Sequence, residues 1–393
     1  MSDTVIAAFA RTPIGRFRGA LAGVAATGLG ATALAACLGR AALPASRVND
    51  VVLGNVLGAG LGQAPARQAA LAAGLPTSVG AQSIDKVCGS GLQALISGAR
   101  ALALAEADFV LAGGQESMSQ APFLLKDARG GLPTGDRSLL DSLLLDGLHD
   151  ASLGCHMGVL AERCARDYGL TRDQQDGFAA ESFRRAQRAA AAGCFAAELV
   201  PVALPARRGT ADLVSEDEGP ARFVAERLAT LPPAFAPEGS ITAANASQLS
   251  DGAAALLLGR LDSVAAAGLR PLARLVSWGA HAGDPAQFCA APVAAIREAL
   301  AGAGWRSDSV DLWEINEAFA VVPLVAMREL ALPHARVNAR GGAIALGHPL
   351  GATGARIVVT LVAALQQLDL RRGVAALCIG GGEALALCVE RSD

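Results

Sequence analysis

Short apolar runs alternate along this chain with longer stretches that are rich in Ala and Leu. The apolar runs are residues 4–9, 51–56, 109–112, 312–315 and 374–379. Runs of this length and character are typical of buried strands, whereas the longer stretches have the spacing of helices. The alternation predicts an α/β fold in which helices cover a largely buried sheet.

One pattern of residues occurs twice in the chain. Residues 88–91 (CGSG) are followed by an Ala/Leu helical pattern and then by residues 109–116 (FVLAGGQE). In the same way, residues 348–351 (HPLG) are followed by a helical pattern and then by residues 376–383 (ALCIGGGE). Upstream of the two copies, residues 50–55 (DVVLGN) and 311–316 (DLWEIN) also correspond, because each begins with Asp and ends with Asn. Such a repeat indicates two related α/β halves.

The segment between the two halves differs in character. It carries more charge and more turn residues, with a helical stretch over residues 173–191 and an acidic patch at residues 216–218. An insertion of this length is expected to form its own elements and to serve in binding. We therefore predict an N-terminal half of residues 1–118 with 250–268, an inserted loop domain of residues 119–249, and a C-terminal half of residues 269–393.

Composition and charge exclude several classes of protein. Apolar residues make up 52% and charged residues 18% of the chain, which excludes disorder. The longest uncharged run, between Arg18 and Arg40, consists of Ala, Gly and Thr with scattered Leu, unlike a membrane span, and the N-terminus lacks the pattern of a secretory signal. A net charge of −3 and 4% aromatic residues argue against nucleic-acid binding. We expect a cytoplasmic protein with neither a membrane nor a nucleic-acid partner.

Eight cysteines are spread along the chain without C-x-x-C pairs, so the sequence predicts neither a metal site nor a disulfide framework. Free thiols in a reducing compartment are the better interpretation. Cys88 stands between a strand candidate and a helix, where backbone N–H groups and the helix dipole favour a thiolate. Its neighbouring glycines allow a substrate to approach the backbone. A buried structural cysteine is the alternative interpretation.

Three more candidate residues lie in the second half. His348 stands in a Gly-rich turn at the place where the first half has Cys88, so the repeat would bring these two side chains together. Cys378 precedes three glycines at a strand end, where exposed backbone N–H groups bind a developing oxyanion. Asn316 ends another strand candidate and either orients a water or caps the next helix. Inert core residues are the alternative for His348 and Cys378.

The chain as a whole resembles the thiolases, in particular the acetyl-CoA acetyltransferase group. The resemblance covers essentially the whole length and rests on ordered motifs, which are residues 10–15 (ARTPIG), 87–91 (VCGSG), 114–119 (GQESMS), 156–158 (HMG), 175–179 (QDGFA), 245–247 (NAS), 251–254 (DGAA), 316–319 (NEAF), 347–351 (GHPLG) and 378–382 (CIGGG). It implies a duplicated, layered α/β/α/β/α fold with an inserted loop domain. It also implies an acyl-CoA C-acetyltransferase that condenses two acetyl-CoA to acetoacetyl-CoA and CoA, or thiolyses a short 3-ketoacyl-CoA.

The resemblance further implies roles for the candidate residues. Cys88 would be acylated by a CoA thioester in a ping-pong reaction, with His348 lowering its pKa, and Cys378 would move the proton of the second substrate. One oxyanion hole would use the backbone N–H groups of Cys88 and Gly380, and the other would use His348 with a water held by Asn316. No cofactor is implied, because CoA thioesters are the substrates. Thiolases are dimers or pairs of dimers, so we expect a homo-oligomer.

The resemblance also assigns the binding of acyl-CoA and CoA mainly to the middle segment. The residues that would line the pantetheine tunnel are Leu148, His156, Met157, Ala243, Ser247 and Leu249. Those that would lie near the acyl end are Phe235, Phe288, Ala318 and Phe319. Arg222 is the candidate for the adenine end.

Three places in the chain depart from the usual family pattern, and the minor one is Thr353, where serine is common. Ala244 stands where glycine is usual, so a left-handed backbone there would cost about 1 kcal/mol. Residues 288–292 (FCAAP) replace the more frequent MGIGP, which leaves open whether the enzyme is a short-chain thiolase or a broader-chain degradative one. A β-ketoacyl synthase would lack Cys378 or have a second His there, and a nonenzymatic lipid-binding relative would have lost Cys88. Both alternatives are therefore less favoured.

Overall fold

A computed structural model describes residues 4–204 and 212–392. Within these ranges ten strands form one mixed sheet in the order β14-β15-β16-β13-β1-β12-β5-β3-β4, with β2 paired to β12. The strands are β1 (Thr4–Arg11), β2 (Gly15–Arg16), β3 (Asp50–Gly54), β4 (Gly80–Ile84), β5 (Phe109–Ser117), β12 (Ser250–Arg260), β13 (Ala273–Ala282), β14 (Leu312–Ile315), β15 (Arg372–Ile379) and β16 (Glu383–Arg391). All five strands that the apolar runs predict are present.

The sheet consists of two half-sheets that meet along β1 and β13. Two antiparallel residue pairs join these strands, Val5 with Arg274 and Ile6 with Ala273. The N-terminal half-sheet contains β1, β12, β5, β3 and β4, and the C-terminal half-sheet contains β13, β16, β15 and β14. Hydrogen bonding is therefore continuous from one half to the other, which the sequence did not predict.

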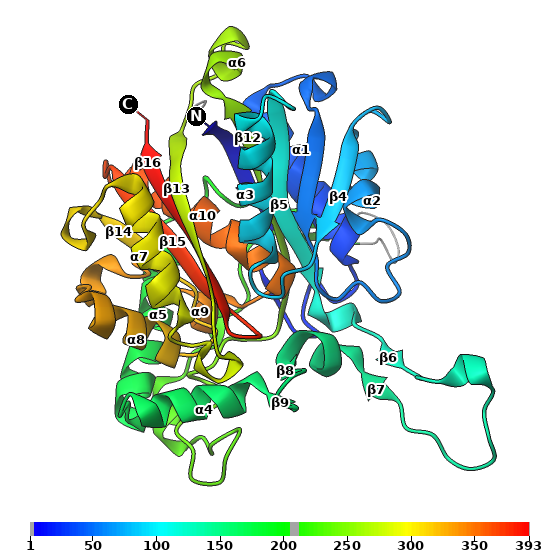
Figure 1. The fold of residues 1–393 in the computed structure, drawn as a ribbon, viewed down its shortest axis with the longest axis vertical. Helices are drawn as coiled ribbons and strands as arrows, with labels where there is room; N and C mark the ends of the chain where they lie inside the picture. The colour runs from blue at the N-terminus through cyan, green and yellow to red at the C-terminus, as the bar shows by residue number, and fades with distance from the viewer. Residues whose placement is uncertain (1–3, 205–211, 393) are drawn as a thin grey trace.

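Helices form three layers around the two half-sheets (Figure 1). The central layer holds α3 (Ser90–Ala103) and α10 (Leu350–Gln367), which share one hydrophobic core with the strands on either side. On the outer faces, α1 (Ala26–Ala41) and α2 (Pro65–Ala72) cover the N-terminal half-sheet, and α7 (Ala291–Ala303) and α8 (Val321–Leu330) cover the other. The predicted α/β/α/β/α layering is confirmed.

The repeated pattern corresponds to a repeated connection. In the first half α3 leads into β5, which pairs in parallel with β3. In the second half α10 leads into β15, which pairs in parallel with β14. The two helices pack against each other, and Gly354 permits this close approach because a Cβ there would lie 2.2 Å from the backbone N of Leu92. The start of each helix is thus brought to the centre of the molecule.

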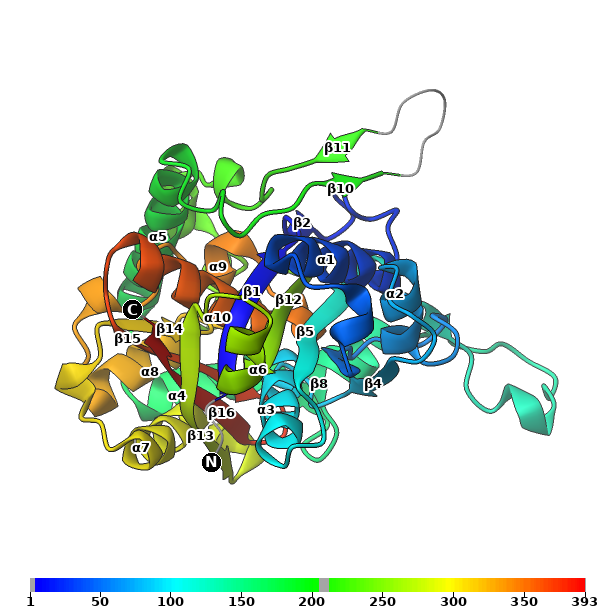
Figure 2. The same ribbon diagram turned by 90° about the horizontal axis from the view of Figure 1, so that it is seen from above.

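The middle of the chain forms smaller elements outside the large sheet. Its ribbons and longer helices are β6 (Phe123–Leu124) with β7 (Leu140–Asp141), β8 (His149–Asp150) with β9 (Cys155–His156), β10 (Val202–Ala203) with β11 (Leu213–Val214), α4 (Met157–Asp167) and α5 (Arg172–Ala191). The helix α5 matches the predicted helical stretch and begins with a capping box formed by Thr171 and Gln174. The β6–β7 ribbon projects from the body as an arm (Figures 1 and 2).

Two local features concern the helix α10 and the backbone at Ala244. The helix α10 is long and apolar enough to cross a membrane, but it is a core helix, almost entirely buried between the half-sheets. Ala244 is not among the residues with positive φ, so the strain expected from an alanine at this position does not arise. Two further short helices, α6 (Leu261–Ala266) and α9 (Ala343–Leu346), complete the α-helices of the described residues.

Candidate active site

A small cavity of about 50 Å³ lies where the turns before α3 and α10 meet the end of β15. Most of the side chains singled out from the sequence line it, namely Cys88, Leu148, His156, Met157, Ser247, Phe288, Ala318, Phe319, His348, Cys378 and Gly380. The structure thus brings together residues from both halves and from the middle segment. The volume corresponds to about one or two water molecules, so the space beside the two thiols suits a small group.

Three further residues line the same cavity and were not predicted. Val87 precedes Cys88 and Leu350 follows His348 by two positions, so each stands in a motif that the sequence analysis had already singled out. Gly147 lies in a π-helical turn over Leu143–Leu148, and no motif marks it. The sequence motifs could therefore have identified Val87 and Leu350 as cavity residues. They could not have identified Gly147, which an irregular turn brings to the cavity.

Three predicted residues lie close to this cavity without lining it. The backbone N–H of Asn316 donates to the carbonyl of Ala376 at 2.9 Å, while both polar atoms of its buried side chain have no hydrogen-bond partner among the described residues. The ring of Phe235 stacks on His156 with centroids 4.7 Å apart. Leu249 packs against the apolar cluster that also contacts Cys88.

The other two predicted residues, Arg222 and Ala243, line a second cavity of about 380 Å³. Arg227 and Gln248 line it as well, and neither was predicted. Arg222 lies in a short 3₁₀ helix over Pro220–Arg222, and an element of three residues is too short to show a periodic pattern that would mark its neighbours. Two guanidinium groups at one cavity favour an anionic ligand.

The Cys88 thiol lies between two backbone donors. The backbone N–H groups of Gly380 and of Cys88 itself lower the pKa of this thiol, because both favour a thiolate. Burial outweighs them and raises the pKa of Cys88 to about 12, with the carboxylate of Glu116 adding to the increase. The backbone donors thus favour a thiolate, but burial has the larger effect on the pKa of Cys88 because the surrounding protein replaces water around the sulfur.

His348 is buried and held in one orientation by Thr353. Its Nδ1 lies 2.7 Å from Thr353 Oγ1, and the Thr353 hydroxyl donates its proton to the carbonyl of Pro349 at 3.0 Å. A hydroxyl has one proton, so Nδ1 must carry the hydrogen and donate to Oγ1, which leaves the lone pair on Nε2. Burial, together with the charge of Arg356, lowers the pKa of His348 to about 3. The imidazole is therefore neutral, with Nε2 available as a base.

Cys378 is buried near the end of β15, and three glycines follow it. Burial is the main cause that raises the pKa of its thiol, and the neighbouring Cys88 adds to the increase. Gly381 and Gly382 have φ values of 88° and 85°, and a Cβ on Gly382 would lie 2.5 Å from the carbonyl oxygen of Gly283. This turn therefore requires glycine, and it directs the Gly380 N–H toward Cys88.

A buried carboxylate fixes the elements around the cavity. Glu116, at the end of β5, accepts hydrogen bonds from the backbone N–H groups of Val56 (3.1 Å), Leu57 (3.2 Å) and Gly351 (2.9 Å) and from the Asn55 side chain (3.0 Å). These donors come from the loop after β3 and from the first turn of α10. Burial raises the pKa of Glu116 to about 7 despite these bonds. Its contacts tie α10 to the N-terminal half-sheet.

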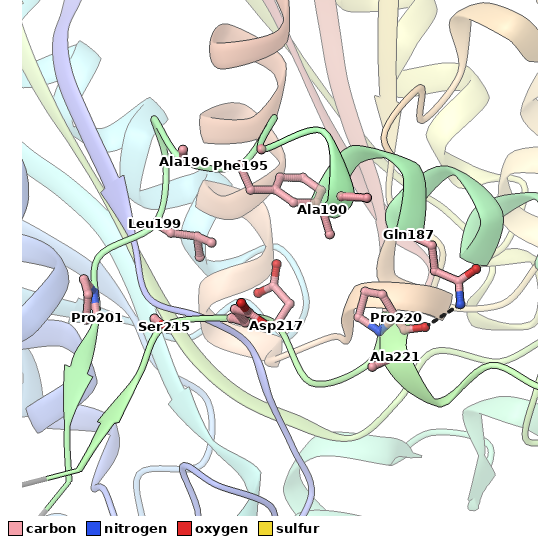
Figure 3. A pocket seen from close by; sticks show the side chains of 13 residues that line it. Gln187, Ala190, Phe195, Ala196, Leu199, Pro201, Ser215, Asp217, Pro220 and Ala221 are labelled. Carbon is pink, nitrogen blue, oxygen red and sulfur yellow. Dashed lines mark hydrogen bonds between the residues drawn. The ribbon is translucent and has the colours of Figure 1, made fainter.

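A larger cavity of about 580 Å³ lies between the end of α5 and the β10–β11 ribbon (Figure 3). None of the residues predicted for catalysis or binding lines it. Its Asp217 already pairs with the buried Arg11 at 2.8 Å, and its Gln187 donates to the carbonyl of Pro220. Two of the polar side chains at this cavity are therefore already paired. Across residues 4–204 and 212–392, no three His, Cys, Asp or Glu side chains are grouped as metal ligands.

Comparisons with known proteins agree with the resemblance drawn from the motifs. The model of the thiolase N-terminal domain matches residues 4–262, and that of the thiolase C-terminal domain matches residues 269–391. An acetyl-CoA acetyltransferase from Pseudomonas aeruginosa is 49% identical over 392 residues, and a probable acetyl-CoA acetyltransferase from Escherichia coli K12 is 48% identical over 394 residues. In both cases 100% of each chain is covered.

Solved structures show the same fold. The acetyl-CoA acetyltransferase from Bacillus anthracis is 39% identical with a TM-score of 0.97, and the match covers 100% of this chain and 99% of that chain. The thiolase Acat5 from Ascaris suum, solved in complex with coenzyme A, is 43% identical with a TM-score of 0.94, and the match covers 99% of this chain and 100% of that chain.

Proposed function

This chain belongs to the thiolase family and is an acyltransferase, and we propose that it transfers acetyl groups between CoA thioesters. In one direction two acetyl-CoA would give acetoacetyl-CoA and CoA, and in the other a short 3-ketoacyl-CoA would be cleaved by CoA. The observation that carries this proposal is the meeting of two thiols, a neutral imidazole and two backbone N–H groups at one small cavity.

Acylation of Cys88 is the first step that this arrangement supports. The sulfur attacks the carbonyl carbon of acetyl-CoA while Nε2 of His348 takes the thiol proton, so no free thiolate has to accumulate. The N–H groups of Cys88 and Gly380 receive the negative charge that develops on the carbonyl oxygen. When the carbon–sulfur bond to CoA breaks, the Cys378 thiol protonates the leaving sulfur and becomes a thiolate.

Carbon–carbon bond formation is the second step. The Cys378 thiolate takes a proton from the α-carbon of a second acetyl-CoA, and the resulting enolate attacks the acetyl group on Cys88. The negative charge on the thioester oxygen of this enolate has to be stabilised by hydrogen-bond donors. Nε2–H of His348 and a water held by Asn316 suit this role. The bond to the Cys88 sulfur then breaks, and His348 returns its proton to that sulfur.

The second cavity supports the binding of the nucleotide end of CoA. CoA carries phosphate groups, and Arg222 and Arg227 both line that cavity. Leu148, His156 and Ser247 line the catalytic cavity, where the pantetheine arm would present the thioester. On this proposal CoA thioesters are substrates, and the enzyme needs no further cofactor.

The walls of the catalytic cavity favour a short acyl group. Phe288 is only 2% exposed, and its ring lies edge-on to Phe319 with centroids 6.2 Å apart. Phe319 in turn meets Phe235 edge-on at 6.0 Å, and Phe235 stacks on His156. These aromatic rings wall the small cavity beside the two thiols, which supports a short-chain enzyme over a broader-chain degradative one.

Chain length is tested by comparing kcat/KM for acetoacetyl-CoA with that for longer 3-ketoacyl-CoA thioesters. The proposal predicts a strong preference for acetoacetyl-CoA, and it predicts that Phe288→Ala raises the relative rate on the longer thioesters. Equal rates on short and long substrates by the unmodified protein would favour the broader-chain alternative.

A Cys378→Ala variant distinguishes the roles of the two thiols. This variant should still accept an acetyl group from acetyl-CoA but should lose most of its turnover in both directions, because no group remains to move the second proton. Cys388→Ala, a buried cysteine of β16 that does not line the cavity, is the matched control and should turn over normally. Normal turnover by Cys378→Ala would contradict the proposed function.

We also propose that the protein is a homo-oligomer, a dimer or tetramer, in the cytoplasm, with a place in fatty acid metabolism. The arm formed by β6 and β7 supports oligomerisation, because it exposes large apolar side chains that include Phe123 (63%), Leu132 (60%) and Leu139 (60%). All eight cysteines are free thiols in the structure, which supports a reducing compartment.

A further inference from the structure

The two backbone N–H groups that converge on Cys88 belong to loops far apart in sequence. Cys88 lies in the loop between β4 and α3, and we call this loop together with the first residue of α3 the nucleophile loop (residues 85–90). Gly380 lies in the turn between β15 and β16, which we call the glycine turn (residues 380–382). The distance between these two donors therefore depends on what holds the two loops together.

The nucleophile loop contains a strained residue and is stabilised by hydrogen bonds among its own residues. Val87 has a φ of 46°, a left-handed conformation that is costly for a side chain branched at Cβ. Its N–H donates to Asp85 at 3.0 Å, and the Ser90 hydroxyl accepts from the N–H of Lys86 at 2.8 Å and donates to the carbonyl of Val87 at 2.7 Å. These bonds fix the shape of the loop. They do not fix its position relative to the glycine turn.

One ion pair links the two loops through their side chains. The Nζ of Lys86 pairs with the carboxylate of Glu383, and neither side chain makes another hydrogen bond or ion pair with the described residues. Lys86 lies two residues before Cys88, and Glu383 lies three residues after Gly380. The glycine turn has no side chains of its own, and its backbone is held by a hydrogen bond from Gly283 N–H to the carbonyl of Gly382 at 3.0 Å. Glu383 is the first residue after the turn whose side chain can link it to the nucleophile loop. Neither Lys86 nor Glu383 lines the catalytic cavity.

We propose that the Lys86–Glu383 ion pair is a positioning element that sets the spacing of the Cys88 and Gly380 N–H groups for the oxyanion of acyl transfer. This inference rests on the proposed function, because the oxyanion arises only if Cys88 attacks a thioester. Lys86 and Glu383 act through the backbone and are positioning residues. Both side chains are partly exposed, at 27% and 38%, so their loss should affect catalysis far more than stability.

The test measures the rate constant for acylation of Cys88 by acetyl-CoA in a single turnover. Lys86→Met and Glu383→Gln should each lower this rate constant roughly 10- to 100-fold, the range expected when an oxyanion donor is displaced. The KM for acetyl-CoA should change little, because the side chains of the binding cavities are untouched. The charge-exchanged double variant K86E/E383K should recover at least roughly tenfold over the worse single variant, if a restored pair restores the spacing.

A matched control removes an ion pair elsewhere on the surface. Arg297 pairs with Glu329 between α7 and α8, with comparable or greater exposure, and Arg297→Met should leave acylation unchanged. The thermal midpoints of all variants should lie within a few degrees of that of the unmodified protein.

Three results would overturn the positioning role. They are single variants that acylate at the normal rate, a double variant no faster than the worse single one, and a rate loss matched by a large drop in thermal midpoint. If the unmodified protein itself formed no acyl adduct on Cys88, the proposed function would fail, and the positioning role with it.

Discussion

Thr353 determines which nitrogen of His348 is able to accept a proton. Its hydroxyl proton is committed to the carbonyl of Pro349, so its oxygen accepts from Nδ1–H and leaves Nε2 as the base. Thr353 stands where serine is usual in the family. The structure explains why that substitution is mild, since either residue supplies the same hydroxyl.

Thr353→Val should therefore lower kcat/KM by roughly 10- to 100-fold, less than the roughly 100- to 10,000-fold that general base catalysis contributes, because the base itself remains. Valine has nearly the same shape as threonine but no oxygen to accept from Nδ1–H, so the ring loses its fixed tautomer. Thr353→Ser is the matched control and should remain within about threefold of the unmodified rate. Steady-state kinetics with acetoacetyl-CoA and CoA measure both, and an active valine variant would contradict the tautomer assignment.

The burial of Cys88 and His348 leads to a prediction of how the reactivity of the Cys88 thiol depends on pH. The pKa of Cys88 is raised to about 12 and that of His348 is lowered to about 3, so the resting pair is neutral between these values. The thiolate fraction should then rise about tenfold per pH unit through the neutral range. The rate of Cys88 alkylation by iodoacetamide, followed on the Cys88 peptide, should rise with the same slope from about pH 6 to pH 9. A plateau below pH 8 would indicate a preformed thiolate and imidazolium.

The sequence predicts which residues meet at the cavity but not their ionisation. Cys88 and His348 stand in Gly-rich turns that repeat between the halves, and that repeat predicted their meeting, whereas Cys378 was singled out by the glycines that follow it. The direction of the Cys88 pKa shift was not predictable, because a sequence shows the helix that follows a cysteine but not the protein packed around its sulfur. In the same way, a substituted glycine such as Ala244 suggests strain, and only the backbone conformation shows that none is present.

At the scale of elements, the contact between α3 and α10 sets the position of the site. Each helix begins beside a reacting residue, and glycines on both helices let the backbones approach. A Cβ on Gly354 would lie 2.2 Å from Leu92 N, and one on Gly91 would lie 2.8 Å from Ala355 N. Changes in this contact therefore move Cys88 relative to His348.

Gly354→Ala should lower the free energy of unfolding by about 1 to 3 kcal/mol, the range for overpacking, and should lower acylation as well. Gly39→Ala in α1 is the matched control, because a Cβ there meets no neighbour within 4 Å and alanine favours a helix. Urea unfolding curves give the stabilities. Equal stability of the two variants would show that α3 and α10 tolerate a wider spacing than the structure indicates.

Elements with a strong apolar pattern were predictable, and irregular ones were not. The five strands and the α5 helix follow from periodicity and composition. The pairing of β1 with β13 was not predictable, since it depends on two residue pairs between strands far apart in sequence. The π-helical turn that brings Gly147 to the cavity lacks any local signal, because tertiary contacts rather than propensity produce it.

At the scale of the whole molecule, the β6–β7 arm is the feature that a monomer does not explain. It exposes large apolar side chains and projects from the body (Figure 2). A second copy of the chain would bury these side chains, in line with the proposed homo-oligomer.

Replacing Leu132 and Leu139 by serine should reduce the oligomer to a smaller assembly in sedimentation velocity. Leu104→Ser is the matched control, because Leu104 is 70% exposed but lies just after α3 on the body, and it should leave the assembly unchanged. An assembly of unaltered mass in the arm variant would remove the arm from the interface.

The most direct test of the central claim is to locate the acyl group after incubation of the protein with acetyl-CoA. Peptide mass spectrometry of the quenched protein should place a single acetyl group on Cys88, and Cys88→Ala should carry none. The same experiment on Cys378→Ala should still show the acetyl group on Cys88. An acetyl group on Cys378 in the unmodified protein, or stable acetylation of Cys88→Ala, would contradict the account.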